Sequence, residues 1–213
     1  MKKIIIIDYG CGNILSIARA IEHIGYIPEI TDDKNKIINS SNVILPGVGA
    51  FGSAIKNLDE CNLRDTILEY AKIHQKPLLG ICLGMQILLT VGNEHGVFKG
   101  LNLIEGEVIK ISKNKVKNFK VPHVGWNEVS PSNNKQSWSN GILDDSLIGK
   151  SFYFVHSYIA VTKNPSSTVG ICDYLGTNIP SIISSGNVLG CQFHPEKSGK
   201  NGLEFLKSFC EMN

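Results

Sequence analysis

Apolar runs alternate with helical patterns in the first part of the chain. The apolar residues between 14 and 24 recur every three or four positions, which predicts a helix capped by Asn13 and ended by Gly25. The expected strands here are Lys3–Ile7, Val43–Leu45 and Pro77–Ile81, and further helices are expected at 63–71 and 83–89. Strands that alternate with helices predict a parallel sheet covered on both faces. A ligand site is then expected at the carboxyl ends of the strands.

Short apolar runs separated by turn residues, Pro180 among them, dominate the chain after Leu101. The expected strands are 103–111, 152–155, 158–161, 168–172, 181–183 and 188–193. A last helix is expected from Asn201, with Glu204 completing a capping box. The polar stretch Asn133–Asp145 is expected to be a surface loop. Because no linker or repeat interrupts the pattern, we expect one domain over residues 1–213.

The composition is that of an ordinary globular protein. The chain has 213 residues, 42% hydrophobic and 19% charged, with a net charge of +2. That charge is too small to indicate nucleic acid or a membrane surface as a partner. The apolar run after Lys3 is too short for a signal peptide, and no run is long enough to span a bilayer. Six cysteines without metal-like spacing favour free thiols in the cytoplasm and no metal.

A cysteine flanked by glycines follows the expected strand Pro77–Ile81. In Gly80-Ile81-Cys82-Leu83-Gly84-Met85-Gln86, Cys82 stands between a strand and a helix, as in a nucleophile elbow. Glycine permits a turn where a Cβ would collide with backbone. The helix start favours a thiolate, and the Leu83 amide is available to a developing oxyanion. Taken alone, the motif is also compatible with a buried core cysteine beside packing glycines.

A candidate base and its orienting group follow the apolar run that ends at Phe193. His194 at a strand end can reach a nucleophile at another strand end, and Glu196 can orient its imidazole. Pro195 fixes one backbone angle between them. The His-Pro-Glu sequence alone is typical of a loop turn. Together with the elbow it predicts a Cys-His-Glu triad.

A glycine-rich turn, Pro46-Gly47-Val48-Gly49, follows the expected strand Val43–Leu45. Such a turn can present backbone N–H groups to an anion or an oxyanion. A simple connection from strand to helix is the other interpretation of this segment.

The three motifs, in this order, resemble those of class I glutamine amidotransferases. More narrowly, the chain is similar to the glutaminase subunits of imidazole glycerol phosphate synthases, which serve histidine biosynthesis. The narrower likeness rests on five blocks, namely Asp8–Asn13, Pro46–Gly49, Pro122–Asn127, Tyr153–Tyr158 and His194–Gly199. The resemblance extends from Ile5 to about Met212.

The resemblance implies an α/β, flavodoxin-like fold, with a mostly parallel sheet, helices on both faces and a β-rich C-terminal half. It implies hydrolysis of L-glutamine to glutamate through a Cys82 thioester, without a cofactor or a metal. It also implies a heterodimer with a barrel-shaped cyclase that receives the ammonia. The implied roles are catalysis for Cys82, His194 and Glu196; the oxyanion hole for Val48, Gly49 and Leu83; glutamine binding for Gln86, Ser157 and Tyr158; and partner contact for Asn13, Tyr153 and Lys197.

Other functions remain open at this point. The segment Val91–Gly96 differs from what is expected of histidine-pathway subunits, and paralogues supply ammonia to a sugar amidotransferase in surface-polysaccharide synthesis. A non-catalytic binding module is disfavoured because all three triad residues are present. A flavin-binding protein is disfavoured because Gly10–Asn13 lacks a Ser/Thr-rich phosphate cradle. His123 and His156 are expected in a polar wall or a loop, and Trp126 as a partner contact or a core anchor.

Overall fold

A nine-stranded sheet, of order β2-β1-β3-β4-β13-β12-β11-β8-β9, forms the centre of the fold. It is seen in a computed structural model that describes residues 1–112, 120–132, 137–138 and 143–212. The strands at one side pair in parallel and are β1 (Lys3–Ile7), β2 (Ile27–Thr31), β3 (Asn42–Leu45), β4 (Leu78–Ile81) and β13 (Val188–Cys191). The remaining strands pair antiparallel and are β8 (His123–Pro131), β9 (Lys150–His156), β11 (Thr168–Tyr174) and β12 (Thr177–Ser185).

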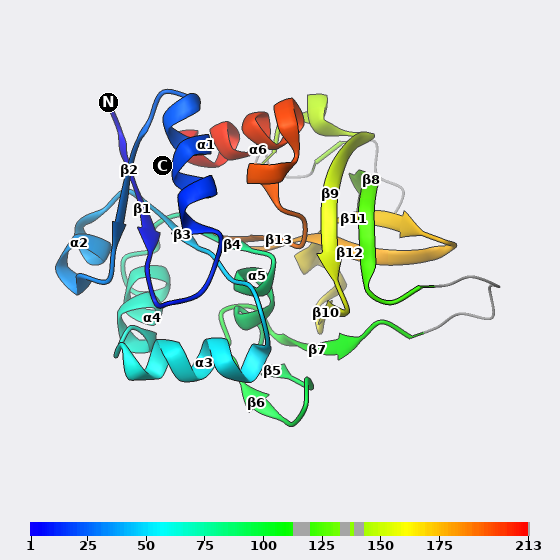
Figure 1. Cartoon of the computed structure of the whole chain (residues 1–213), viewed down its shortest axis with the longest axis horizontal. Coiled ribbons are helices and arrows are strands. Elements are labelled where there is room, and N and C mark those ends of the chain that lie inside the picture. The colour runs from blue at the N-terminus through cyan, green and yellow to red at the C-terminus, as the bar shows by residue number, and fades with distance from the viewer. Residues whose placement is uncertain (113–119, 133–136, 139–142, 213) are drawn as a thin grey trace.

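A four-stranded second sheet, of order β10-β7-β5-β6, lies below the antiparallel half in the view of Figure 1. Its strands are β5 (Val91–Gly92), β6 (Phe98–Lys99), β7 (Gly106–Lys110) and β10 (Tyr158–Thr162). Strand β10 follows β9 almost immediately, so the chain passes from one sheet to the other at Ser157.

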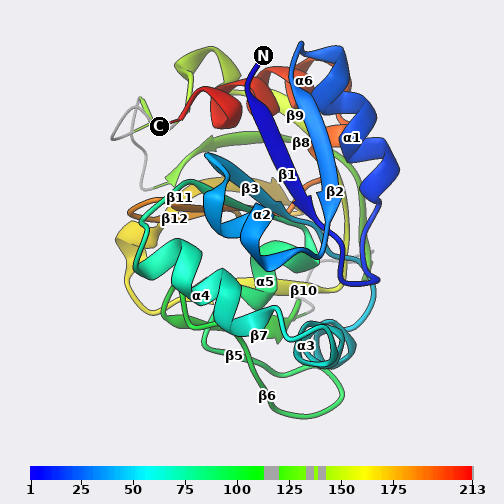
Figure 2. The same cartoon turned by 90° about the vertical axis from the view of Figure 1, so that its left-hand side faces the viewer.

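Helices cover both faces of the parallel half (Figures 1 and 2). One face carries α1 (Ile14–His23) and α6 (Gly199–Glu211), and the other carries α2 (Lys34–Asn39), α3 (Phe51–Glu60), α4 (Arg64–Lys72) and α5 (Leu83–Ile87). Strand β1 shows why this arrangement forms. Ile4 and Ile6 belong to the hydrophobic core under α1 and α6, whereas Ile5 and Ile7 belong to the core under α3 and α4. A strand buried on both faces is apolar at every position, which is the pattern read from the sequence.

The expected α/β fold with a parallel sheet between helices is confirmed, but several local predictions are wrong. Pro180 lies within β12 opposite Ile171, beside a β-bulge, and does not form a turn. The last helix begins at Gly199 rather than Asn201, and its expected capping box does not form. The Asn201 side chain instead donates to the Ser151 carbonyl. Asn13 likewise makes no capping hydrogen bond to α1.

The expected surface loop Asn133–Asp145 lies partly outside the described residues. Where it is described, Ser137, Asp144 and Asp145 are exposed as expected, whereas Trp138 and Leu143 are buried. The backbone N–H of Trp138 donates to the carboxylate of Asp145, the first residue of the 3₁₀ turn Asp145–Leu147. Among the described helices, none is long and apolar enough to cross a membrane.

A fully buried aromatic cluster holds the end of β13 against α6. Phe205 on α6 packs on Phe193 with ring centroids 5.1 Å apart, and Phe193 stacks on Phe152 at 4.2 Å. Phe193 directly precedes His194. The cluster therefore fixes the chain at the point where the candidate base begins.

We expect Phe205→Ala to lower the free energy of unfolding by about 3–5 kcal/mol, because it leaves a cavity among rings that cannot fully close over it. Urea denaturation followed by circular dichroism measures this change. Lys207→Ala, at a solvent-facing position of the same helix, is the control and should change stability by less than about 0.5 kcal/mol. A loss at Phe205 no larger than at Lys207 would contradict the role given to the cluster.

Candidate active site

Cys82 stands on a sharp turn between β4 and α5. Its backbone has φ 55° and ψ −110°, a conformation that non-glycine residues rarely adopt. The flanking glycines make the turn possible. A Cβ at Gly84 would lie 2.0 Å from the Leu45 carbonyl oxygen, and one at Gly80 would lie 2.7 Å from the Gly84 backbone. The sequence motif therefore forms the expected nucleophile elbow.

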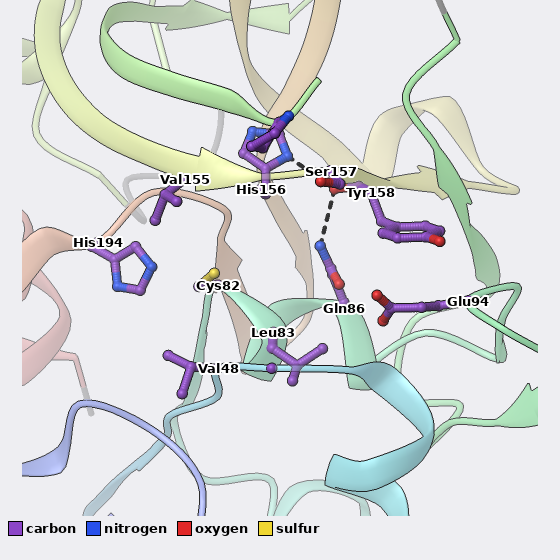
Figure 3. Close-up of a pocket in the computed structure, with 12 residues that line it drawn as sticks. Val48, Cys82, Leu83, Gln86, Glu94, Val155, His156, Ser157, Tyr158 and His194 are labelled. Carbon is purple, nitrogen blue, oxygen red and sulfur yellow. Dashed lines mark hydrogen bonds between the residues drawn. The ribbon is translucent and has the colours of Figure 1, made fainter. Parts of the chain in front are cut away.

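Parallel pairing of β4 with β13 brings His194 to this elbow. Gly80 pairs with Gly190 and Ile81 with Cys191, and the Cys82 N–H donates to the Cys191 carbonyl over 2.8 Å. His194 follows β13 by three residues, and Figure 3 shows its ring beside the Cys82 sulfur. The His194 N–H is held by the Tyr153 carbonyl at 2.9 Å, so strand β9 also supports the base.

The three residues of the predicted triad come together in one hydrogen-bonded row. His194 Nδ1 lies 2.9 Å from Glu196 Oε1, which leaves Nε2 to face Cys82. Burial disfavours the imidazolium, but hydrogen bonds and charge interactions with Cys82 and Glu196 outweigh it and raise the pKa of His194 to about 10. At neutral pH the imidazole is therefore protonated.

Glu196 is fixed from two sides. Its side chain is fully buried in the 3₁₀ turn Pro195–Lys197, and Oε1 accepts from both His194 Nδ1 and Asn13 Nδ2, the latter at 3.3 Å. Within the described chain, the second oxygen, Oε2, has no hydrogen-bond partner. Asn13, expected at the partner surface, is half-buried against the triad. Lys197 is exposed at the end of the turn.

A cavity of about 310 Å³ opens beside Cys82, at the carboxyl ends of β4 and β13 (Figure 3). The predicted glutamine-binding residues Gln86, Ser157 and Tyr158 line it together with His194. Gln86 Nε2 donates to the Tyr158 carbonyl over 3.0 Å. The volume suits a small molecule such as an amino acid.

Glu94, which sequence reasoning did not place in the site, and His156, which it expected in a polar wall or a loop, also line this cavity. Glu94 is the only carboxylate among the described lining residues, and its Oε2 accepts from the Phe51 N–H at the start of α3 over 2.7 Å. His156 also lines the cavity, and burial lowers its pKa to about 3. Its Nδ1 donates to the Tyr158 carbonyl, because a carbonyl can only accept. The segment around Glu94 carried no motif that could have identified it.

His123 lies behind His156 and is fully buried. Its Nδ1 is 2.9 Å from His156 Nε2, and its Nε2 is 2.7 Å from Asn127 Oδ1. The His123 ring also stacks on Phe154 and Tyr174. Both histidines therefore belong to a wall of the cavity, and neither joins the Cys-His-Glu row.

The predicted oxyanion-hole segment lies across the cavity from His156. Val48 and Gly49 line the cavity with Leu83, but the Leu83 N–H donates to the Gly47 carbonyl over 3.3 Å. Gly49 has φ 96°, and a Cβ there would meet nothing within 4 Å, whereas a Cβ at Gly47 would lie 2.5 Å from the Gly84 backbone nitrogen, so the turn is open at Gly49 and tightly packed at Gly47. Among the described residues, no group of three or more His, Cys, Asp or Glu side chains is arranged to hold a metal ion.

The sequence matches the family model "Glutamine amidotransferase class-I" over residues 5–212. The chain belongs to the class I glutamine amidotransferases. As a member of that family it is an enzyme. Cys82 and His194 line the cavity, and Glu196 contacts His194 from outside it.

Named relatives cover nearly the whole amidotransferase chain. It is 39% identical over 214 residues to "Imidazole glycerol phosphate synthase subunit HisH 1" of Legionella pneumophila (strain Paris), with all of both chains covered. It is 43% identical to the HisH subunit of Methanosarcina barkeri, again with full coverage of both. The HisH subunit of Bacillus cereus (strain G9842) is 45% identical over 97% of this chain and 93% of the relative.

Solved structures share the amidotransferase fold at lower identity. A chain of PurLQS from Thermotoga maritima superposes with a TM-score of 0.70 at 21% identity, covering 98% of this chain and 97% of that one. A glutamine amidotransferase of known crystal structure gives a TM-score of 0.67 at 17% identity, covering 96% of this chain and 98% of that one. At these identities the likeness shows the fold.

The raised pKa of His194 predicts that its imidazolium persists well above neutral pH. A free histidine, with a pKa of about 6.5, is largely neutral at pH 8. His194 should release its proton only as the pH rises towards about 10, so its ring resonances should stay those of the imidazolium between about pH 6 and 9. Nuclear magnetic resonance of the ¹⁵N-histidine-labelled protein measures this.

The matched variant is Glu196→Gln, which removes the carboxylate charge and keeps the shape of the side chain. The pKa of His194 should fall in this variant, because one of its two partners no longer favours the imidazolium. A His194 ring that is already neutral at pH 8 in the unmutated chain would contradict the assignment.

Proposed function

We propose that this chain is the glutaminase subunit of an imidazole glycerol phosphate synthase. It hydrolyses L-glutamine and passes the ammonia to a cyclase subunit in histidine biosynthesis. The observation that carries the chemistry is the row in which His194 bridges Cys82 and Glu196 beside a small cavity. The partner and the pathway are supported by relatives of 39–45% identity that bear this subunit's name.

The proposed reaction has two halves. The Cys82 thiolate attacks the side-chain amide carbon of glutamine, a C–S bond forms, and negative charge moves to the amide oxygen. His194 gives its proton to the nitrogen as the C–N bond breaks, so ammonia leaves and a glutamyl thioester remains. The neutral imidazole then takes a proton from water, hydroxide attacks the thioester, and the C–S bond breaks to release glutamate. Glu196 keeps the ring oriented through both proton transfers.

Glu94 would bind the α-ammonium group of glutamine. It supplies the one carboxylate of the described lining residues, at the end of the cavity away from His194 (Figure 3). Gln86, Ser157 and Tyr158 line the same cavity and would hold the rest of the substrate. A zwitterion oriented by its ammonium group presents its side-chain amide to the sulfur.

The oxyanion hole would be completed only when a partner docks. The Leu83 N–H is already engaged by the Gly47 carbonyl, and Gly49 lets the neighbouring peptides turn. We propose that docking rotates the peptide before or after Val48, so that an N–H points at the oxyanion. A missing oxyanion donor costs about 10²–10³-fold in turnover, which would keep the isolated subunit nearly silent.

An exposed apolar patch beside the cavity fits the docking surface. Val124 is 53% and Trp126 56% exposed on β8, opposite Val155 and Tyr153 on β9. The Trp126 and Tyr153 rings contact edge to face at 5.9 Å. Because Val155 also lines the cavity, a partner on this patch would cover the site from which ammonia leaves. Lys197 and the loop before α1 would border the same surface.

The triad variants should differ in a fixed order. Cys82→Ala should abolish glutamine hydrolysis and His194→Ala should nearly abolish it, because the first removes the nucleophile and the second the proton carrier. Glu196→Gln should keep a measurable remnant, since it retains a hydrogen-bonding group beside the ring. Glutamate release in the presence of the cyclase is the readout, with circular dichroism as the check on folding. Hydrolysis by folded Cys82→Ala would end the proposal.

The partner proposal predicts stimulation of a weak enzyme. Glutaminase activity should be low for the chain alone and should rise by about 10²–10³-fold with the cyclase and its acceptor substrate. Trp126→Ser should weaken binding of the cyclase, measured by calorimetry, whereas Ile73→Ser should not. Ile73 is 74% exposed and lies at the end of α4, away from the cavity. Full activity of the isolated chain would refute the gating, and unchanged binding by Trp126→Ser would refute the surface.

A further inference from the structure

Gln192 is a fully buried amide in contact with the nucleophile. It follows β13 directly, and its backbone N–H donates to the Ser181 carbonyl over 2.9 Å. Its side-chain Nε2 lies 3.8 Å from Cys82 Sγ, which is within hydrogen-bonding range for the large sulfur atom. The surrounding hydrogen bonds determine which end of the Gln192 amide faces the sulfur.

The orientation of the Gln192 amide follows from its neighbours. The Tyr158 carbonyl can only accept, so the Gln86 atom that faces it at 3.0 Å must be the NH₂ group. The same NH₂ group donates to Gln192 over 3.0 Å, so the atom of Gln192 that receives it must be the oxygen. The Gln192 NH₂ group is then the one that faces Cys82. His156 donates to the same Tyr158 carbonyl, so two side chains hold this acceptor in place.

An N–H aimed at sulfur favours the thiolate over the thiol. A thiolate accepts strongly, whereas a thiol accepts weakly, and a hydrogen bond to the charged form lowers the free energy of that form. The His194 ring lies beside the same sulfur (Figure 3). Cys82, Gln192 and His194 are all buried, so the Gln192 donor replaces part of the hydration that a buried thiolate loses.

We propose that Gln192 is a further catalytic residue, whose side-chain N–H holds the Cys82 sulfur as a thiolate in an orientation set by Gln86. Gln86 thus has a positioning role besides lining the substrate cavity. Gln192 transfers no proton. As the C–S bond forms, charge leaves the sulfur, so this hydrogen bond weakens and its contribution lies in the resting thiolate. The inference rests on the proposed function only in taking Cys82 as the nucleophile.

The test compares the rate at which iodoacetamide labels Cys82 in Gln192→Met and in the unmutated chain from pH 5 to 10. Peptide mass spectrometry measures this rate. Methionine fills a similar volume without a donor. The pH of half-maximal rate should rise by about one unit, which leaves roughly tenfold less thiolate below that pH. At pH 10 the variant should react as fast or faster, because a less stabilised thiolate is the better nucleophile. A purely structural defect would not produce this crossing.

A buried amide elsewhere provides the matched control. Asn42 is fully buried and donates to the Phe209 and Met212 carbonyls, remote from the cavity. Asn42→Leu should destabilise the protein and leave the Cys82 profile unchanged. Gln192→Glu should move the half-maximal pH upward further than Gln192→Met, because a carboxylate repels a thiolate. A profile for Gln192→Met that coincides with that of the unmutated chain would overturn the proposal.

A measurement on the unmutated chain covers the case in which the variants do not fold. With ¹⁵N-labelled glutamine side chains, the Gln192 amide resonance should shift with pH at the same midpoint as the Cys82 labelling rate. The resonance of exposed Gln75 should not move. A Gln192 resonance that does not shift at the midpoint of the Cys82 labelling rate would also overturn the proposal. None of these readouts needs glutamine or a partner, so this proposal and the glutaminase proposal can fail separately.

Discussion

The site depends on the parallel pairing of β4 with β13, which joins two segments that are far apart in the sequence. The register sets Gly80 against Gly190, and the Cys82 N–H then donates to the Cys191 carbonyl. A side chain at Gly190 would collide with Met85, whose side chain would lie 2.8 Å from the new Cβ. Glycines on both strands therefore let α5 lie directly over the pair. Any shift of this register would separate the nucleophile from its base.

Burial and close contact change the protonation of His194, which this strand pairing brings to Cys82. In water, a thiol and an imidazole at neutral pH remain largely uncharged. In the site, Cys82 and Glu196 outweigh the effect of burial and raise the pKa of His194 to about 10, so the imidazole is held as imidazolium at neutral pH. Buried charged groups are stabilised only where hydrogen bonds replace part of their hydration. The amide of Asn13 donates to Glu196 and the amide of Gln192 donates to Cys82, while Gln86 holds Gln192 in place.

The sequence was informative where a residue's role depends on its own neighbours. Strand β1 is buried on both faces and therefore apolar throughout, and the Cys82 elbow needs its glycines within two positions. Strand β2 was missed because it lies at the sheet edge, exposes Ile27 and Ile30, and contains Pro28. Its sequence has neither the alternation nor the apolar run of a strand.

Residues whose role depends on distant partners could not be found in this way. Glu94 faces the cavity because β5 and β6 lie under α3, and Asn13 reaches Glu196 across α1 and the turn Pro195–Lys197. Neither pairing leaves a local pattern in the sequence. The resemblance indicated Gln86, Ser157 and Tyr158, which line the cavity, and it indicated Asn13 as a partner contact but not its hydrogen bond to Glu196.

The most direct test of this account is to trap the glutamyl thioester on Cys82. The chain and its cyclase partner would be mixed with L-glutamine, quenched in acid within milliseconds, and digested for mass spectrometry. The account predicts a hydroxylamine-sensitive glutamyl adduct on the peptide that contains Cys82, and none on the other cysteine peptides or in Cys82→Ala. Steady hydrolysis of glutamine with no adduct on Cys82, or with the adduct on another cysteine, would contradict it.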